Sequence, residues 1–123
     1  MGAAGIFQQF VAAINSHDVS TRVALMTSDH LFVDGLGNRV EGANRMEAGW
    51  RHYFEMCPDY SIETEHVVTD GPRVLAAGQA GGTIRGTAWK IPAAWLAVIC
   101  DDKVQEWRVF ADNKPVYEIL ARS

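Results

Sequence analysis

The chain has 123 residues, which is enough for one domain with a hydrophobic core. Its composition, 48% hydrophobic and 21% charged residues, is ordinary for a globular protein. The net charge of -4 and the lack of clustered Lys and Arg argue against a nucleic-acid partner. No apolar run approaches the ~20 residues that span a bilayer. We therefore predict a single domain over residues 1–123 that binds neither nucleic acid nor membrane.

The N-terminus and the cysteines bear on location. The first residues lack the basic region of a signal peptide. Cys57 and Cys100 are far apart and form no CxxC motif, which favours free thiols in a reducing compartment over a disulfide framework. We therefore predict a cytoplasmic protein.

The first half of the chain predicts three helices. Residues 3–16 place apolar side chains at helical spacing, and Asp18 is a good N-cap for a second helix that buries Val19, Val23 and Met26. A third helix follows Gly42 and ends before Pro58. Its apolar stripe at i, i+3, i+4, i+7 and i+8 consists of Met46, Gly49, Trp50, Tyr53 and Phe54.

From residue 60 the hydrophobic period changes to two, which predicts strands. We expect strands over 60–68, from 73 to about 86, from about 88 to 100, and over 104–112, with a short helix or tail over 114–123. Shorter strands precede the third helix. The predicted class is α+β, with a strongly curved antiparallel or mixed sheet wrapped around three N-terminal helices to form a cone.

The last hairpin predicts an interface. A two-residue turn at Asp101-Asp102 pairs Cys100 with Lys103, and regular alternation then pairs Trp95 with Arg108. Both faces of this hairpin carry large apolar groups, so one must be covered from outside. We expect a homodimer in which the outer face of the sheet contributes Trp95, Ile99 and Phe110.

Asp34 is the main candidate for chemistry. It ends a strand on which His30 and Phe32 point to the same face, and a glycine turn follows. A carboxylate on an apolar face is costly to bury unless it is paired, protonated or used. Asp34 is therefore either an acid or base, or a turn residue that bonds its own backbone. His30 is either its partner or a histidine bonded to a backbone carbonyl.

No motif indicates a metal or a cofactor. The four histidines show no HxH or HExxH spacing, and no glycine motif joins a strand to a helix as in a nucleotide-binding fold. We predict neither.

Taken together, these features resemble the nuclear transport factor 2-like superfamily, in particular its SnoaL-like and ketosteroid isomerase-like branches. The resemblance covers nearly the whole chain. It is carried by the order and spacing of Ser28-Asp29, Phe32-Val33-Asp34, Glu41-Gly42, Trp50 to Phe54, Cys57-Pro58-Asp59, Gly82-Thr83, Gly86 and residues 102–112.

The resemblance implies a cone that is usually dimeric and has a ligand cavity between the helices and the sheet. Isomerases, dehydratases, epoxide hydrolases, polyketide cyclases and non-catalytic modules share this fold. Asp34 falls where ketosteroid isomerases keep their general base, whereas Phe10 and Leu96 fall where their oxyanion hole has a tyrosine and an aspartate. The roles of His66 and Asp112 stay open.

We therefore predict an apolar cavity in which Asp34, assisted by His30, transfers a proton in an isomerisation, cyclisation or dehydration without a cofactor. The predicted substrate-binding residues are Phe10, Phe32, Trp50, Phe54, Leu96, Trp107 and Val109. The alternative is a non-catalytic small-molecule-binding or interaction module on the same fold.

Overall fold

The computed structural model describes residues 2–122, and Met1 and Ser123 lie outside the described residues. The helices are α1 (Ala3–Asn15), α2 (Val19–Ala24), α3 (Ala43–Met56) and α4 (Lys114–Ala121). The strands are β1 (Met26–Val33), β2 (Arg39–Glu41), β3 (Ser61–Asp70), β4 (Arg73–Ile84), β5 (Thr87–Cys100) and β6 (Lys103–Ala111).

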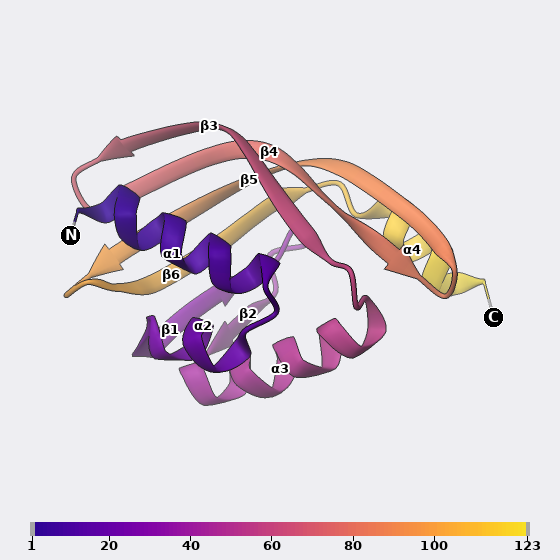
Figure 1. Cartoon of the computed structure of the whole chain (residues 1–123), viewed down its shortest axis with the longest axis horizontal. Coiled ribbons are helices and arrows are strands. Elements are labelled where there is room, and N and C mark those ends of the chain that lie inside the picture. The colour runs from indigo at the N-terminus through magenta and orange to yellow at the C-terminus, as the bar shows by residue number, and fades with distance from the viewer. Residues whose placement is uncertain (1, 123) are drawn as a thin grey trace.

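The strands form one open, mixed sheet. Its 6 strands lie in the order β2-β1-β6-β5-β4-β3, and β1 runs parallel to β6 while the other neighbours are antiparallel. Figure 1 shows β3 to β6 curving over α1, with α3 facing the same side of the sheet from below. The predicted α+β cone is confirmed. The sheet curves around the helices because its inner face and the apolar helix stripes must bury each other.

The N-terminal elements follow the predicted pattern closely. Asp18 caps α2, accepting a hydrogen bond from the Thr21 amide at 3.1 Å. The first strand starts earlier than expected, because the chain is extended from Met26 rather than from His30. Met26 is buried as predicted, but it belongs to β1 and not to the second helix.

Small residues bring β3 and β4 together on the inner side. The register between these strands shifts between Thr64 and His66, opposite Gly78. A Cβ atom at Gly78 would collide with the carbonyl oxygen of Glu63, so only glycine fits there. Large rings fill the space beneath the sheet: Trp107 lies 5.7 Å from Phe7 between ring centroids and is fully buried.

The final hairpin departs from its predicted register. Asp101 and Asp102 both have positive φ, and Cys100 pairs with Lys103 as expected. A shift between Val98 and Ile99 then moves every later pair by one residue, so that Trp95 faces Val109. Such a bulge exchanges the two faces of everything beyond it. The prediction that Trp95 lies on the outer face is therefore wrong: it is 1% exposed and faces the interior of the cone. Ile99, predicted on the same face, is partly buried and packs against the core.

The last described segment forms a helix that closes one end of the cone. Arg85, in the turn between β4 and β5, donates hydrogen bonds from Nη1 to the carbonyl oxygens of Leu120 (3.2 Å) and Arg122 (3.1 Å). These bonds satisfy carbonyls at the C-terminus of α4. Figure 1 shows α4 beside this turn, at the end of the sheet remote from the N-terminus.

The cysteines and the helix lengths also bear on the predictions. Cys57 and Cys100 are both free thiols, as predicted. Within residues 2–122, none of the helices has the length and apolar character needed to cross a membrane.

Candidate functional site

A cavity of about 390 Å³ lies between α3, α4 and the inner face of the sheet. This volume falls within the usual range for small-molecule sites, about 300–1,000 Å³. The sheet contributes Phe32, Trp89, Ile91, Ala93, Trp95 and Val109 to the wall, α3 contributes Met46, Gly49, Trp50, Tyr53 and Met56, and α4 contributes Val116, Tyr117 and Leu120. Most of the wall is therefore apolar.

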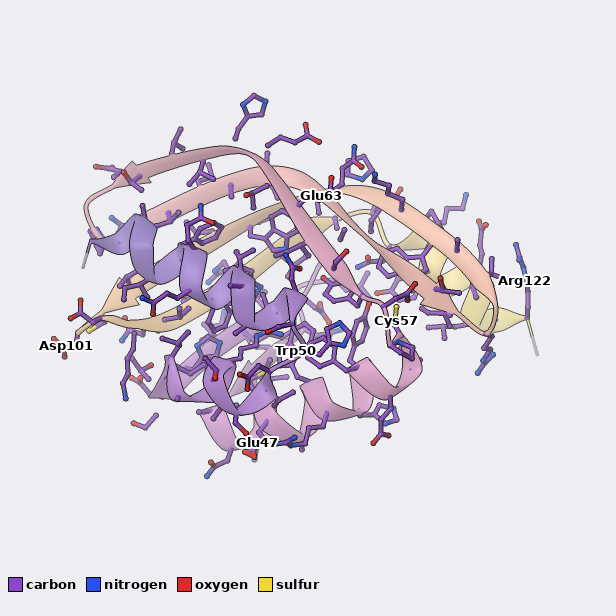
Figure 2. All side chains as sticks on the ribbon, in the orientation of Figure 1. Glu47, Trp50, Cys57, Glu63, Asp101 and Arg122 are labelled. Carbon is purple, nitrogen blue, oxygen red and sulfur yellow. The ribbon has the colours of Figure 1, made fainter. Side chains whose placement is uncertain are left out.

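Four aromatic rings form a continuous part of this wall. Tyr60 lies 6.3 Å from Trp50 and 6.0 Å from Trp89, and Tyr53 stands perpendicular to Tyr60 at 5.1 Å, all between ring centroids. Trp50 and Tyr53 share a face of α3 because they are three residues apart. Such ring pairs hold one another in fixed orientations. Figure 2 shows Trp50 in the interior between α3 and the sheet.

Tyr60 is positioned by the turn that follows α3. The carboxylate of Asp59 accepts hydrogen bonds from the Thr83 amide (2.7 Å) and the Thr83 hydroxyl (2.8 Å). These two bonds hold the pKa of Asp59 below its ordinary value. They also join the end of α3 to β4, so the tyrosine that follows Asp59 is directed into the cavity wall.

Arg22 lies directly behind the aromatic wall. Its side chain is 1% exposed, and its guanidinium carbon is 3.5 Å from the centroid of Trp50 and 4.8 Å from that of Phe10. Nε and Nη1 have no hydrogen-bond partner. Among residues 2–122, no carboxylate forms an ion pair with Arg22. The guanidinium therefore contacts ring faces and has no carboxylate partner in this part of the chain.

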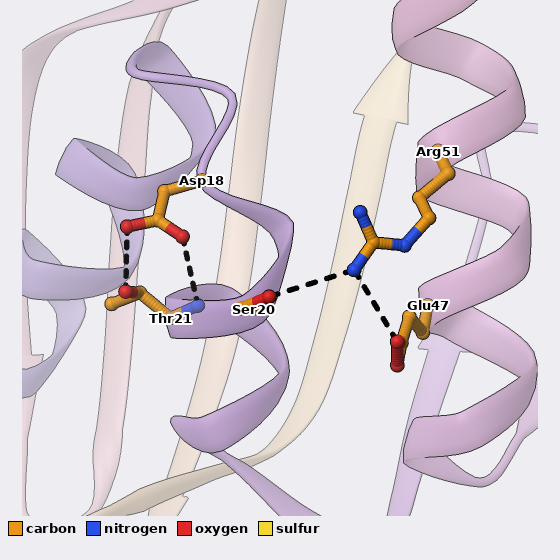
Figure 3. A network of polar contacts seen from close by, with 5 residues as sticks. All are labelled: Asp18, Ser20, Thr21, Glu47 and Arg51. Carbon is orange, nitrogen blue, oxygen red and sulfur yellow. Dashed lines mark hydrogen bonds and ion pairs between the residues drawn. The ribbon is translucent and has the colours of Figure 1, made fainter.

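The packing of α2 against α3 places Arg22 at this point. Figure 3 shows Asp18 bonded to Thr21 at the start of α2, and Arg51 of α3 reaching Ser20 at 3.5 Å and Glu47 at 3.4 Å. These exposed contacts are individually weak. One of them joins α2 to α3, and the buried Arg22 of α2 contacts Trp50 of α3.

The burial of Arg22 is energetically unfavourable. Loss of water lowers its pKa to about 9, an effect that the neighbouring Tyr60 partly opposes. The guanidinium therefore stays charged at neutral pH. Burying an unpaired ion costs several kcal/mol, whereas a desolvated cation–π contact contributes about 2 kcal/mol. The aromatic contacts offset only part of this cost.

The two tyrosine hydroxyls are neutral hydrogen-bond donors. Burial raises the pKa of Tyr60 to about 12, although the charge of Arg22 works in the opposite direction. Burial likewise raises the pKa of Tyr53 above its ordinary value. Both side chains line the cavity. They can therefore donate a proton in a hydrogen bond to a ligand oxygen.

Asp34 lies at the rim of the cavity and caps a turn. Its Oδ1 accepts hydrogen bonds from the amides of Leu36 and Asn38, both at 2.9 Å, and its Oδ2 accepts one from the Asn38 side chain at 3.1 Å. This geometry matches the turn role that the sequence left open. Asp34 also lines the cavity.

His30 lies in the core, away from the rim. It is fully buried, and its Nδ1 lies 2.7 Å from the carbonyl oxygen of Val104, so Nδ1 carries the proton and donates it. Burial is the main cause of the lowered pKa of His30. Four strand positions separate it from Asp34, a distance of about 13 Å along the chain. The structure therefore gives His30 the backbone-bonded arrangement, and it does not bring the two side chains together.

The predicted substrate-binding residues lie in three places: the cavity wall, the core and the outer side of the sheet. Phe32, Trp50 and Val109 line the cavity. Phe10, Phe54 and Trp107 lie outside its wall, in the hydrophobic core behind the aromatic rings. Leu96 pairs with Arg108 on the outer side of the sheet, because the bulge in the last hairpin exchanged the faces.

Sequence reasoning did not assign Tyr53, Tyr60 and Trp89 to the site, and it also missed α4 and Arg22. The contribution of α4 was indicated by the spacing of Val116 and Leu120, four residues apart on one helix face. The signal for Arg22 was its place three residues after Val19, on the buried stripe of α2. Because arginine is usually exposed, this position was not predicted to be buried.

Metal-ligating side chains do not gather in the described part of the chain. Within residues 2–122, no group of three or more His, Cys, Asp or Glu side chains could hold a metal ion.

The open six-stranded sheet curved around its helices has the nuclear transport factor 2-like fold, which is also that of an NTF2-like protein from Cytophaga hutchinsonii with a TM-score of 0.77 and 14% identity over 95% of this chain and 96% of that one. The family model described as the SnoaL-like domain matches residues 7–107. The chain therefore belongs to the SnoaL-like domain family. No functionally curated protein matches its sequence.

Solved structures of similar shape support the same fold. A protein from Shewanella denitrificans OS-217, assigned as a SnoaL-like polyketide cyclase, is 16% identical with a TM-score of 0.87, and the match covers 98% of each chain. An epoxide hydrolase of the LEH-like type from M. tuberculosis is 18% identical with a TM-score of 0.84, over 98% of this chain and 90% of that one. At these identities the likeness shows the fold alone.

Another structure belongs to a hypothetical protein from Catenulispora acidiphila DSM 44928 with a ketosteroid isomerase-like fold, in complex with trimethylamine. It is 18% identical with a TM-score of 0.78, and the match covers 85% of this chain and 83% of that one.

The lowered pKa of His30 predicts how stability depends on pH. Below about pH 6.5 the unfolded chain takes up a proton at this histidine, while the folded protein does not until its lower pKa is reached. The free energy of unfolding should therefore fall as the pH is lowered from 6.5 to 5. Urea titrations at several pH values measure this slope. The slope should be reduced in His30→Gln, whose amide can still donate to Val104, and an unchanged slope would contradict the assignment.

Proposed function

We propose that this protein binds a small apolar molecule in the aromatic cavity. The observation that carries the proposal is the wall itself, in which a group of packed rings lines part of a space of about 390 Å³ and the hydroxyls of Tyr53 and Tyr60 offer hydrogen bonds. A few polar groups in an apolar hollow are typical of small-molecule sites. The structural relatives named as a polyketide cyclase and an epoxide hydrolase have names consistent with small organic substrates.

Two neighbouring alanines on β5 test this proposal. Ala93 lines the cavity, whereas Ala94 lies on the opposite side of the strand and pairs with Phe110. The probe is 2-naphthamide, a flat neutral molecule, measured by isothermal titration calorimetry. Ala93→Leu fills cavity space and should weaken binding by roughly tenfold or more, while Ala94→Leu should leave it unchanged. Equal effects of the two substitutions would place the probe elsewhere.

Proton transfer at Asp34 is the second candidate function. The observation in its favour is that Asp34 is an acidic side chain on the wall of the cavity. A carboxylate has about four lone-pair sites, and the turn occupies three of them, which leaves one for a substrate proton. An enolisable ketone bound with its α-carbon near the rim would then lose a proton to Asp34.

Deuterium exchange measures this chemistry without knowledge of the natural substrate. In D₂O the wild-type protein should accelerate exchange at the methyl group of 2-acetonaphthone, as followed by NMR. Asp34→Asn keeps an oxygen that can accept the turn's hydrogen bonds but removes the base, so the acceleration should fall by roughly 10²-fold or more. Exchange that is equally fast in the variant would exclude Asp34 as the base and leave ligand binding as the function.

We also propose a homodimer through the outer face of the sheet. With the corrected register, Leu75 pairs with Leu96 in one row across this face, and Ala94 pairs with Phe110 in the next. Leu75 is 47% exposed and Phe110 52% exposed. Exposed apolar side chains in a row on a sheet favour contact with another protein surface, and the same face of a second copy is the simplest such surface.

A cytoplasmic location remains our proposal, supported by the two free thiols.

Light scattering at micromolar concentration tests the dimer. The wild-type protein should have the mass of a dimer, and Phe110→Lys should be monomeric because it introduces a charge into the proposed interface. Leu36→Lys is the control, since Leu36 is 68% exposed but lies in the turn after β1 and not on the sheet face. A wild-type monomer, or a dimer that survives Phe110→Lys, would contradict the proposal.

A further inference from the structure

The inner wall of the cavity lies next to a positive charge that forms no ion pair with any carboxylate of residues 2–122. Nε and Nη1 of Arg22 are buried without an acceptor, and the guanidinium contacts the rings of Trp50 and Phe10. Two acidic groups act on the neighbouring His30, and neither forms an ion pair with Arg22. These are Asp29, which is exposed, and Glu106, which is paired with Arg108 at 2.6 Å.

Only one layer of side chains separates this charge from the cavity. Trp50 has the guanidinium against its ring face and also lines the cavity. Tyr60, which lines the cavity too, is close enough for Arg22 to influence its ionisation. A charge acts strongly through such an apolar layer, because no water lies between to screen it.

We propose that the cavity selects a ligand that carries a carboxylate on an apolar body. The apolar body contacts the rings and the small residues of the sheet. The carboxylate accepts hydrogen bonds from the hydroxyls of Tyr60 and Tyr53, and its negative charge faces Arg22 across the aromatic layer. This assignment rests on the proposed function, because it names the class of ligand that occupies the same cavity.

The charges at the rim do not account for such a preference. Asp34 has the same sign as a carboxylate ligand, and it lines the opening. Arg45 also lines the cavity, but its side chain is exposed, so water screens its charge. The buried Arg22 is therefore the group that favours an anion, and Arg45 provides a matched control.

The test compares 2-naphthoate with 2-naphthamide, which has the same shape without the charge. In calorimetric titrations at pH 7, the wild-type protein should bind the naphthoate roughly tenfold more tightly. Arg22→Met should abolish this preference while leaving the affinity for the naphthamide within about twofold. Arg45→Met should retain the preference.

Removal of an unpaired buried charge is not expected to unfold the protein, and circular dichroism checks this. If Arg22→Met does not fold, Arg22→Gln carries the same test with a neutral polar side chain. Equal affinity of the wild-type protein for the two probes overturns the carboxylate assignment while the cavity proposal stands. A preference that survives the loss of Arg22, or that disappears with Arg45, also overturns it. Binding of neither probe contradicts both proposals.

Discussion

The contact between Arg22 and Trp50 links most of what is distinctive in this molecule. The guanidinium rests on the indole ring at 3.5 Å and has no carboxylate partner among residues 2–122. It joins α2 to α3, since the two side chains come from those helices. It also gives the interior an unbalanced positive charge. The charge therefore lies directly against one ring of the aromatic wall.

The cavity exists because large and small side chains are unequally distributed over the interior. The rings of Trp50, Tyr53, Tyr60 and Trp89 pack together in one part of the wall. Elsewhere small side chains of the sheet line the space, among them Ala80 and Ala93. Close packing requires that volumes complement one another, and here they do not, so a space of about 390 Å³ remains. A ligand with an apolar body would complete the packing that the chain leaves unfinished.

Much of the fold could be predicted from the sequence, because periodicity and capping are local properties. The α2 cap at Asp18 and the turn at Asp101-Asp102 follow from residue types and spacing alone. The pairing register of β5 and β6 could not be derived by counting residues from the turn. A β-bulge shifts the register, and no sequence pattern predicts its position reliably. That single shift moved Trp95 into the cavity wall and Leu96 out of it.

The candidate site was predictable only in part. Trp50 was identified because it lies on the apolar stripe of α3, and Phe32 because it lies on the inward face of β1. Asp34 was expected either to cap a turn or to act as an acid or base. It caps the turn, and it also lines the cavity, where proton transfer is proposed. The burial of Arg22 was not predicted, because arginine side chains are usually exposed. Tertiary packing, and not any local pattern, decides whether such a side chain is enclosed.

The central claim is that a small apolar molecule enters the cone, and NMR of alanine methyl groups tests it most directly. Ala80, Ala93 and Ala111 line the cavity, whereas Ala77 and Ala94 lie on the outer side of the same sheet. Titration with 2-naphthamide should shift the first three methyl signals and leave the other two in place. Shifts confined to Ala77 and Ala94, or no shifts at all, would contradict the claim.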